Sequence, residues 1–99
     1  MAKYFITNKA VEDLSKIWEY TYEVWSEIQA DKYYELITSS FHQIVQNPER
    51  GKNYDEIDKE IFGLHVGKHI VFYRVAESND IEILRILHQR MDLKNRFDE

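Results

Sequence analysis

The first half of the chain carries apolar residues at the spacing of amphipathic helices. Thr7 or Asn8 is suited to cap the first helix, and from Lys9 onward the apolar residues recur at three- and four-residue intervals, with charged residues between them. The apolar face defined in this way comprises Val11, Leu14, Trp18, Tyr22 and Trp25. Ser26 followed by Gln29 has the pattern of a capping box, which predicts that one helix ends there and another begins.

The second helix is predicted to end at the only proline of the chain. Its apolar side comprises Ile28, Tyr33, Leu36, Ile37, Phe41, Ile44 and Val45. Pro48 has no amide hydrogen and disfavours helical backbone at Asn47, so the two helices form a hairpin that this proline bounds. Trp18 and Trp25 share one helix face, and we assign them to core packing under a sheet rather than to a stacking platform for nucleic-acid bases.

Apolar and β-branched runs predict four strands around the hairpin. The runs are residues 2–6, 61–66, 69–75 and 81–88. Short polar turns separate the last three runs, which therefore form an antiparallel meander. The order strand, helix, helix, strand, strand, strand predicts a single α+β domain over residues 1–99, with the helical hairpin packed on an antiparallel sheet.

The last predicted strand is apolar on both of its sides. Ile81, Ile83 and Leu87 point one way, and Leu84 and Ile86 point the other. Two helices can cover only one face of such a sheet. We therefore expect either the C-terminal residues around Leu93 and Phe97 or a partner to cover the second face.

Length and composition limit the cellular setting. The 99 residues include no cysteine, which excludes disulfides and thiolate zinc sites and permits a reducing compartment. No apolar run approaches the roughly 20 residues that span a bilayer. The N-terminal residues also lack the apolar core of a signal peptide. We therefore expect a cytoplasmic protein without a membrane partner.

The charge of the chain argues against direct binding to nucleic acid. Asp and Glu number 18 and Lys and Arg 13, which gives a formal net charge of -5. Proteins that bind phosphate backbones usually carry a basic face, because counterion release supplies much of their affinity. This chain as a whole lacks that excess of positive charge.

The sequence contains few residues that suggest chemistry. It has no glycine-rich phosphate loop, no nucleophile elbow and no zinc-binding helix motif. His65 and His69 flank the predicted turn at Gly67, and they could face each other across a hairpin at a spacing that metal sites also use. Because no carboxylate or cysteine of matching geometry accompanies them, we expect no metal and no cofactor.

His88 and Arg90 follow the last strand and allow two interpretations. A histidine beside a guanidinium resembles the minimum set for phosphodiester cleavage, in which one group moves a proton and the other stabilises developing negative charge. Alternatively, His88 ends the strand by bonding a backbone carbonyl, and Arg90 pairs with Asp92 or with acidic residues of the helices. We favour the second interpretation.

Several blocks of residues, in their order and spacing, resemble ParE-type toxins of the RelE/ParE superfamily of toxin–antitoxin modules. The blocks are residues 10–14, 17–20, Trp25, Gln29-Ala30, Phe41, Asn47-Pro48, Arg50-Gly51, 69–74 and 83–92, of which the last is the strongest. The resemblance implies a RelE/ParE-like fold, in which a helical hairpin packs against an antiparallel sheet. This is the order of elements that the apolar pattern predicts.

The superfamily divides by activity, and four positions favour one branch. RelE-like members cut messenger RNA in the ribosome with lysines and arginines that here align with Glu60, Phe62 and Ile70, and with a terminal tyrosine that aligns with Phe97. Only Arg90 of that cationic set remains. The resemblance therefore implies a ParE-like toxin that inhibits DNA gyrase by binding, with no catalytic residues. A ribosome-dependent mRNA endoribonuclease of RelE type is the alternative.

The resemblance also implies partners. The first is a ParD-like antitoxin, and the second is DNA gyrase. The toxin would contact operator DNA only indirectly, through the antitoxin. We expect Phe72, Tyr73 and Trp18 to contribute to antitoxin binding. The expected toxic, target-binding surface comprises Arg85, His88, Arg90 and Met91. A member that keeps the fold and the antitoxin but has lost toxicity is a third possibility.

Overall fold

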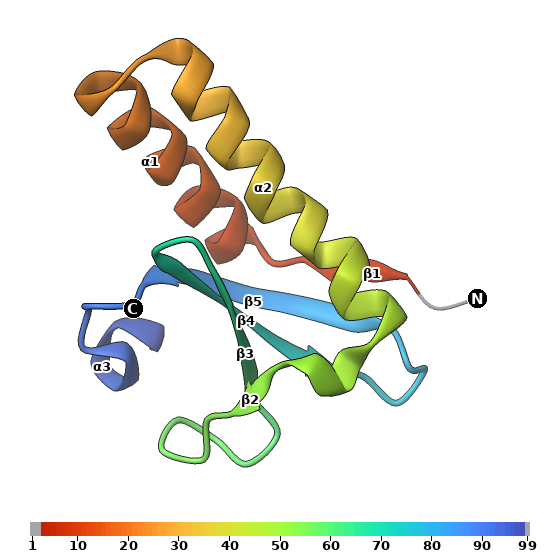
Figure 1. The fold of residues 1–99 in the computed structure, drawn as a ribbon. Helices are drawn as coiled ribbons and strands as arrows, with labels where there is room; N and C mark the ends of the chain where they lie inside the picture. The colour runs from red at the N-terminus through yellow and green to blue at the C-terminus, as the bar shows by residue number, and fades with distance from the viewer. Residues whose placement is uncertain (1–2, 99) are drawn as a thin grey trace.

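The chain forms two long helices, a five-stranded sheet and a short C-terminal helix, as Figure 1 shows for the computed structural model, which describes residues 3–98. The elements are β1 (Tyr4–Ile6), α1 (Asn8–Val24), α2 (Glu27–Gln46), η1 (Pro48–Arg50), β2 (Lys52–Asn53), β3 (Phe62–Val66), β4 (His69–Val75), β5 (Ile81–His88) and α3 (Leu93–Phe97). The α+β fold class and the predicted order of its main elements are confirmed.

The sheet has the strand order β1-β5-β4-β3-β2. Strands β3, β4 and β5 form the predicted antiparallel meander. Strand β1 departs from a purely antiparallel sheet, because it pairs with β5 in parallel, with Tyr4 opposite Ile81. The two-residue strand β2 at the other edge lies outside the four strands that the apolar runs predict. Its brevity explains why no periodic pattern marks it.

Both predicted helix starts are confirmed by side-chain caps. The Thr7 Oγ1 accepts a hydrogen bond from the backbone N–H of Ala10 at 3.1 Å, and the Ser26 Oγ accepts one from Gln29 at the same distance. These bonds satisfy amide groups that the first turn of a helix leaves without partners. The second helix ends at Gln46, directly before Asn47 and Pro48, as expected.

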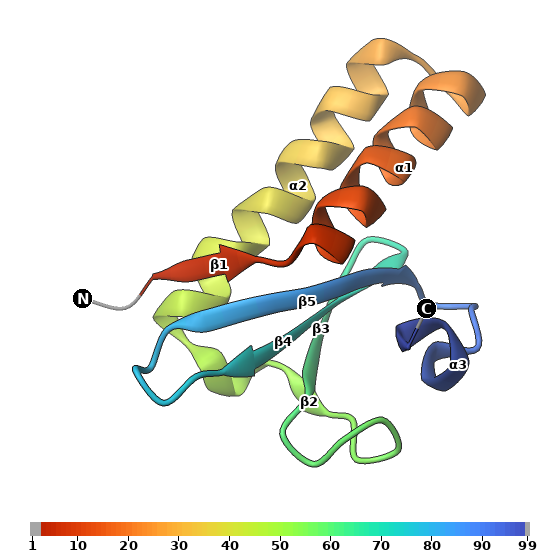
Figure 2. The same cartoon turned by 180° about the vertical axis from the view of Figure 1, so that it is seen from behind.

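The predicted apolar faces of the helices are only partly buried. One core cluster joins the hairpin to the sheet and includes Ala10, Leu14, Ile37, Phe41 and Ile44. In contrast, five residues predicted to be buried are exposed: Val11, Tyr22, Trp25, Ile28 and Leu36. Tyr22, Trp25 and Ile28 are exposed because they lie near the tip of the hairpin, which extends beyond the sheet in Figures 1 and 2. The sheet therefore cannot cover apolar residues near the tip.

The second face of the sheet is covered by the chain itself. A second cluster of buried residues comprises Tyr54, Ile61, Ile70, Phe72 and Leu87. Leu93 and Phe97 of α3 pack against this cluster, and the Phe97 ring meets the Phe72 ring edge-on with centroids 5.6 Å apart. The expectation that C-terminal residues cover this face is thus confirmed, and no partner is required for it.

Candidate binding surface

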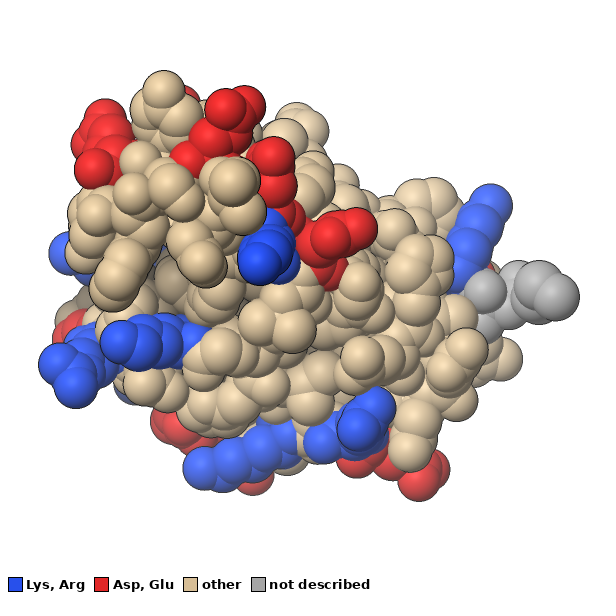
Figure 3. Space-filling model, turned by 45° about the horizontal axis from the view of Figure 1, so that its top comes forward, with Lys and Arg blue, Asp and Glu red and all other residues tan. Residues whose placement is uncertain are grey.

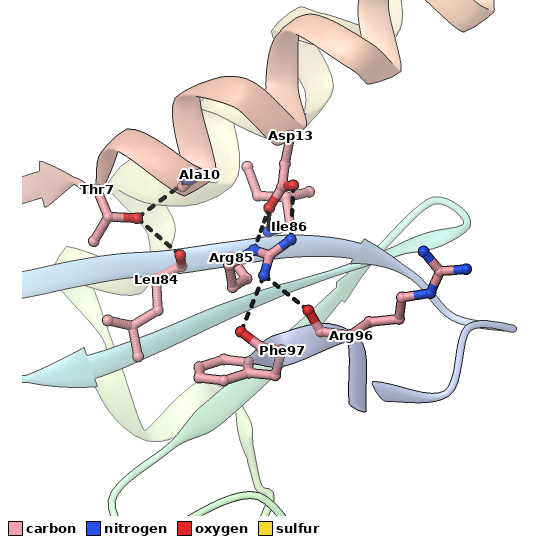
Figure 4. A network of polar contacts seen from close by, with 8 residues as sticks. All are labelled: Thr7, Ala10, Asp13, Leu84, Arg85, Ile86, Arg96 and Phe97. Carbon is pink, nitrogen blue, oxygen red and sulfur yellow. Dashed lines mark hydrogen bonds and ion pairs between the residues drawn. The ribbon is translucent and has the colours of Figure 1, made fainter. Parts of the chain in front are cut away.

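Residues from the start of α1 complete the backbone of β5 where its pairing with β1 ends. The N–H of Thr7 donates to the carbonyl of Ile83 at 3.0 Å, and the Thr7 hydroxyl donates to the carbonyl of Leu84 at 2.8 Å. Farther along, the Asp13 Oδ2 accepts the N–H of Ile86 at 3.0 Å. Figure 4 shows the contacts of Thr7 with Leu84 and of Asp13 with Ile86, and all three contacts fix the second half of the last strand against the first helix.

Arg85 is a buried structural residue rather than part of an exposed surface. Its Nε and Nη2 donate to the two carboxylate oxygens of Asp13 at 2.8 and 3.1 Å, and both side chains are only 11% exposed. Its Nη1 donates to the carbonyls of Arg96 and Phe97 in α3 at 2.8 and 3.0 Å. Although Arg85 was expected on the target-binding surface, it presents little surface to a target, because α1 and α3 enclose it.

Phe72 and Tyr73 are also buried, contrary to the surface role expected of them. Both are fully buried, Phe72 under α3 and Tyr73 under the hairpin. The Tyr73 hydroxyl donates to the carbonyl of Pro48 at 2.6 Å and accepts the N–H of Gly51 at 2.9 Å. They lie on different faces because neighbouring residues of a strand alternate, and the register shift at this point adds one residue, Leu84, to the facing strand β5. In this conformation neither presents surface to an antitoxin.

Trp18, the third expected antitoxin contact, lies on the side of the hairpin. It is half-buried, its Nε1 donates to the Asp31 carboxylate at 3.0 Å, and its ring stacks on Tyr22 with centroids 5.2 Å apart. The assignment of both tryptophans to core packing is therefore wrong, because Trp25 is 73% exposed. Aromatic surface of this extent on a helix is typical of a contact site.

The remaining expected target-binding residues lie together where β5 ends. His88 is half-buried, while Arg90 and Met91 are exposed. The His88 Nδ1 accepts the N–H of Arg90 at 3.1 Å, so the neutral ring carries its proton on Nε2. His88 thus ends the strand by binding a backbone amide, whereas we had expected a backbone carbonyl. The expected pairing of Arg90 with Asp92 is not among the ion pairs formed within residues 3–98.

A polar cluster connects this strand end to the hairpin. The His69 and His88 rings meet edge-on with centroids 5.2 Å apart, and the Tyr33 hydroxyl lies 2.6 Å from the His69 Nδ1. Burial lowers the pKa of His69 from 6.5 to about 4, with a further contribution from His88, while Asp13 opposes the shift. His69 is therefore neutral at pH 7. The Tyr33 hydroxyl also accepts the N–H of Lys68 at 3.0 Å.

A cleft of about 610 Å³ separates the hairpin tip from this cluster. It is lined by Tyr20, Thr21, Val24, Trp25, Gln29, Tyr33, Gly67, Lys68, His69 and His88. Trp25 and Val24 provide an apolar wall, and Lys68 and His88 provide hydrogen-bond donors on the opposite side. The sequence analysis missed this cleft. The only feature of the sequence that could have indicated it is the apolar pattern, which continues from Trp25 to Ile28 across the break between the helices.

The charged side chains do not form a single basic surface on the face that Figure 3 shows. Figure 3 shows acidic side chains gathered over the hairpin and several Lys and Arg side chains along the lower and left margins, without a continuous basic track on that face. Three positions aligned with the catalytic residues of RelE-like nucleases hold exposed Glu60, half-buried Phe62 and buried Ile70. The aligned terminal position, Phe97, packs into the second cluster.

The two histidines of the β3–β4 hairpin do not face each other, so the expectation of such a pair is wrong. In the strand register His65 lies opposite Ile70, and His69 lies opposite Val66. The His65 Nε2 lies 3.3 Å from the Tyr54 hydroxyl, whereas His69 contacts Tyr33 of the hairpin. Within residues 3–98, no group of three His, Cys, Asp or Glu side chains has a geometry suited to a metal ion. Over the same range, no helix is both long and apolar enough to cross a bilayer.

Comparison with solved structures defines the fold class as RelE/ParE-like. The chain is similar to a chain of the chromosomal ParDE toxin–antitoxin system from P. aeruginosa, with a TM-score of 0.76 and 22% identity, over 89% of this chain and 95% of that one. It is also similar to a chain of the toxin–antitoxin complex RelBE2 from Mycobacterium tuberculosis, with a TM-score of 0.69 and 18% identity, over 89% and 98% of the two chains.

Sequence comparison narrows this class to one family. Residues 4–93 match the family described as "ParE toxin of type II toxin-antitoxin system, parDE". Toxin ParE1 of Mycobacterium tuberculosis is 35% identical over 92 residues, which cover 93% of this chain and 94% of that protein. Toxin ParE1 of Caulobacter vibrioides is 31% identical over 94 residues, which cover 95% and 96%. The chain belongs to the ParE family of toxins from type II toxin–antitoxin systems.

Proposed function

We propose that this toxin inhibits DNA gyrase by binding to it, without performing chemistry itself. The observation that carries the proposal is the isolation of Arg90 among the positions that RelE-like nucleases use, where the aligned residues are Glu60, Phe62 and Ile70. Cleavage of a phosphodiester requires several preorganised donors around the developing negative charge. A single exposed arginine does not supply them.

The surface for gyrase is formed by His88, Arg90 and Met91. A strand fixed on both edges delivers these residues to the rim of the fold, so their backbone is held in one position before a partner binds. Arginine and methionine are enriched at protein interfaces, and Met91 is 41% exposed. Gyrase acts on cytoplasmic DNA, so the proposal includes a cytoplasmic location.

A ParD-like antitoxin is the second proposed partner. The similar solved structures are toxin–antitoxin systems, which supports this assignment. We place the antitoxin over the side and tip of the hairpin, where Trp18 is half-exposed and Tyr20, Trp25 and Ile28 are exposed, because apolar surface of this extent favours a protein partner. With a net charge of -5, the toxin would reach operator DNA only through the antitoxin.

A supercoiling assay with purified toxin tests the gyrase proposal. We expect loss of supercoiling together with cleaved DNA, and reversal of both when the antitoxin is added. Arg90→Ala should weaken the inhibition, whereas Arg74→Ala, which changes an exposed arginine at the other end of the sheet, should leave it intact. Unaffected gyrase at micromolar toxin would contradict the proposal.

A ribosome-dependent mRNA endoribonuclease is the second candidate, because His88 and Arg90 both lie at the end of β5 and the His88 Nε2–H is a donor. The same toxin preparation should therefore be incubated with translating ribosomes. Cleaved messenger RNA that disappears in both His88→Ala and Arg90→Ala would favour this candidate. Intact messenger RNA beside inhibited gyrase would exclude it.

A further inference from the structure

We propose that Asp13 and Arg85 are positioning residues that tether α3 and thereby hold residues 88–92 in the conformation that the target recognises. The role of residues 88–92 rests on the proposed function, but the tether itself is a property of the isolated chain. Figure 4 shows the guanidinium of Arg85 between the Asp13 carboxylate and the last turn of α3.

The Arg85 side chain links three elements that are distant in sequence. It bonds Asp13 in α1 through two nitrogens and the carbonyls of Arg96 and Phe97 through a third. The Asp13 carboxylate also accepts the N–H of Ile86, so it is fixed to the strand independently of the arginine. Forked contacts between charged groups are the strongest class of hydrogen bond in proteins, and they fix direction as well as distance.

The short helix α3 depends on this tether for its position. It has only five residues, and helices of that length are not stable by themselves. Two kinds of contact hold it, namely the packing of Leu93 and Phe97 on the second cluster and the two carbonyl bonds from Arg85. Because the bonds go to main-chain carbonyls, they fix the backbone of α3 rather than one of its side chains.

Asp92 connects α3 to the candidate target surface, which is formed by His88, Arg90 and Met91. The Asp92 carbonyl accepts the N–H of Arg96 at 2.9 Å, and its carboxylate accepts the Asn95 amide at 2.6 Å. At the other end, the N–H of Met91 donates to the carbonyl of His88 at 3.0 Å. The segment that carries Arg90 and Met91 is therefore held by β5 on one side and by α3 on the other.

The substitution Arg85→Lys separates the tether from the ion pair. Lysine keeps a positive charge opposite Asp13, but it lacks the planar fork that reaches both the carboxylate and the carbonyls of α3. Arg74→Lys is the matched control, because Arg74 forms the other ion pair within residues 3–98 and that pair is exposed. Neither substitution changes the exposed residues of the candidate target surface.

Amide hydrogen exchange and growth arrest test the proposal together. In Arg85→Lys we expect exchange of the Arg96 amide, which donates to the Asp92 carbonyl in α3, to become about tenfold faster, since hydrogen bonds to charged groups contribute factors of this size. We expect growth arrest on induced expression to be weakened as well. Arg74→Lys should change neither. Unchanged exchange in Arg85→Lys would overturn the tether. Faster exchange with full growth arrest would overturn its role in toxicity.

A second variant guards against failure of Arg85→Lys to fold. Phe97→Ala loosens α3 from the Phe72 ring without touching the ion pair, so it should cause the same two changes. In the double variant, Arg85→Lys should add little to the effect of Phe97→Ala, because both act through α3. Additive loss of growth arrest would contradict the shared route. If the toxin arrests growth but does not affect purified gyrase, only the proposed target is refuted. Amide exchange and growth arrest of the variants would still test the tether.

Discussion

The hydroxyl of Tyr33 in α2 lies 2.6 Å from the Nδ1 of His69 in β4 and accepts the backbone N–H of Lys68. A single hydroxyl thus joins the helical hairpin to the turn between β3 and β4. Tyr33, Lys68 and His69 also line the cleft, together with Trp25 at the hairpin tip.

Removing this hydroxyl should destabilise the protein. In Tyr33→Phe, His69 and the N–H of Lys68 both lose a partner in a half-buried site, so we expect a loss of about 1–3 kcal/mol in the free energy of unfolding. Urea denaturation measures the loss. Tyr20→Phe is the control, because Tyr20 is exposed, and it should change stability by less than about 0.5 kcal/mol. Equal effects of the two substitutions would contradict the role assigned to Tyr33.

The low pKa of His69 predicts a pH dependence of stability. The folded-state value of about 4 lies below the ordinary 6.5, so the unfolded chain binds more protons between these values, and stability should fall as the pH drops from about 6.5 towards 4. After allowance for partial solvent screening, we expect about 1–2 kcal/mol from this residue. His69→Asn should show a shallower decline than the parent chain over this range. His42→Asn, at an exposed position, should follow the parent chain.

Gly67 is required by the turn between β3 and β4. Its φ of +61° lies in the left-handed region, and an added Cβ would come within 2.7 Å of the Tyr33 ring. Gly67→Ala should therefore cost about 1–3 kcal/mol, from the backbone strain and the displaced ring together. Thermal and urea unfolding measure this cost. Asn79→Gly is the matched comparison, because Asn79 also has a positive φ, and there the exchange should be neutral or slightly stabilising.

Trp25 offers a direct measure of antitoxin binding. Trp18→Phe leaves Trp25 as the only tryptophan, and its 73% exposure predicts red-shifted emission in the free toxin. If the antitoxin covers the hairpin tip, the emission should move to the blue when the antitoxin is added. Trp25→Ser should weaken antitoxin binding by about tenfold or more, the scale of an interface hot spot, without reducing stability. Binding that leaves the emission unchanged would place the antitoxin elsewhere.

The local parts of the fold could be predicted because their signals are local. Thr7, Ser26 and Pro48 mark helix boundaries within a few residues of where they act, and the three meander strands carry their own apolar pattern. The parallel pairing of β1 with β5 has no such mark, since its register depends on residues 77 positions apart. The caps and the meander were therefore predicted, whereas the place of β1 in the sheet was not.

The candidate surface was predicted in part for the same reason. His88, Arg90 and Met91 follow a buried strand directly, so their place at its end follows from sequence order. Arg85 lies within that strand, and its burial depends on Asp13, which is 72 positions away. Phe72 and Tyr73 were assigned to a surface because the sheet is apolar on both faces. The sequence left open whether C-terminal residues or a partner cover the second face, and the structure shows that α3 covers it.

The central place of β5 determines when the chain can fold. Strand β5 lies between β1 and β4 and binds the start of α1, yet it leaves the ribosome after the other four strands and both long helices. Contacts between residues so far apart in sequence close slowly, and the sheet cannot be completed while residues 81–88 remain in the exit tunnel. The helical hairpin emerges earlier with its apolar face uncovered. The folded toxin therefore arises only after residues 81–88 have left the tunnel.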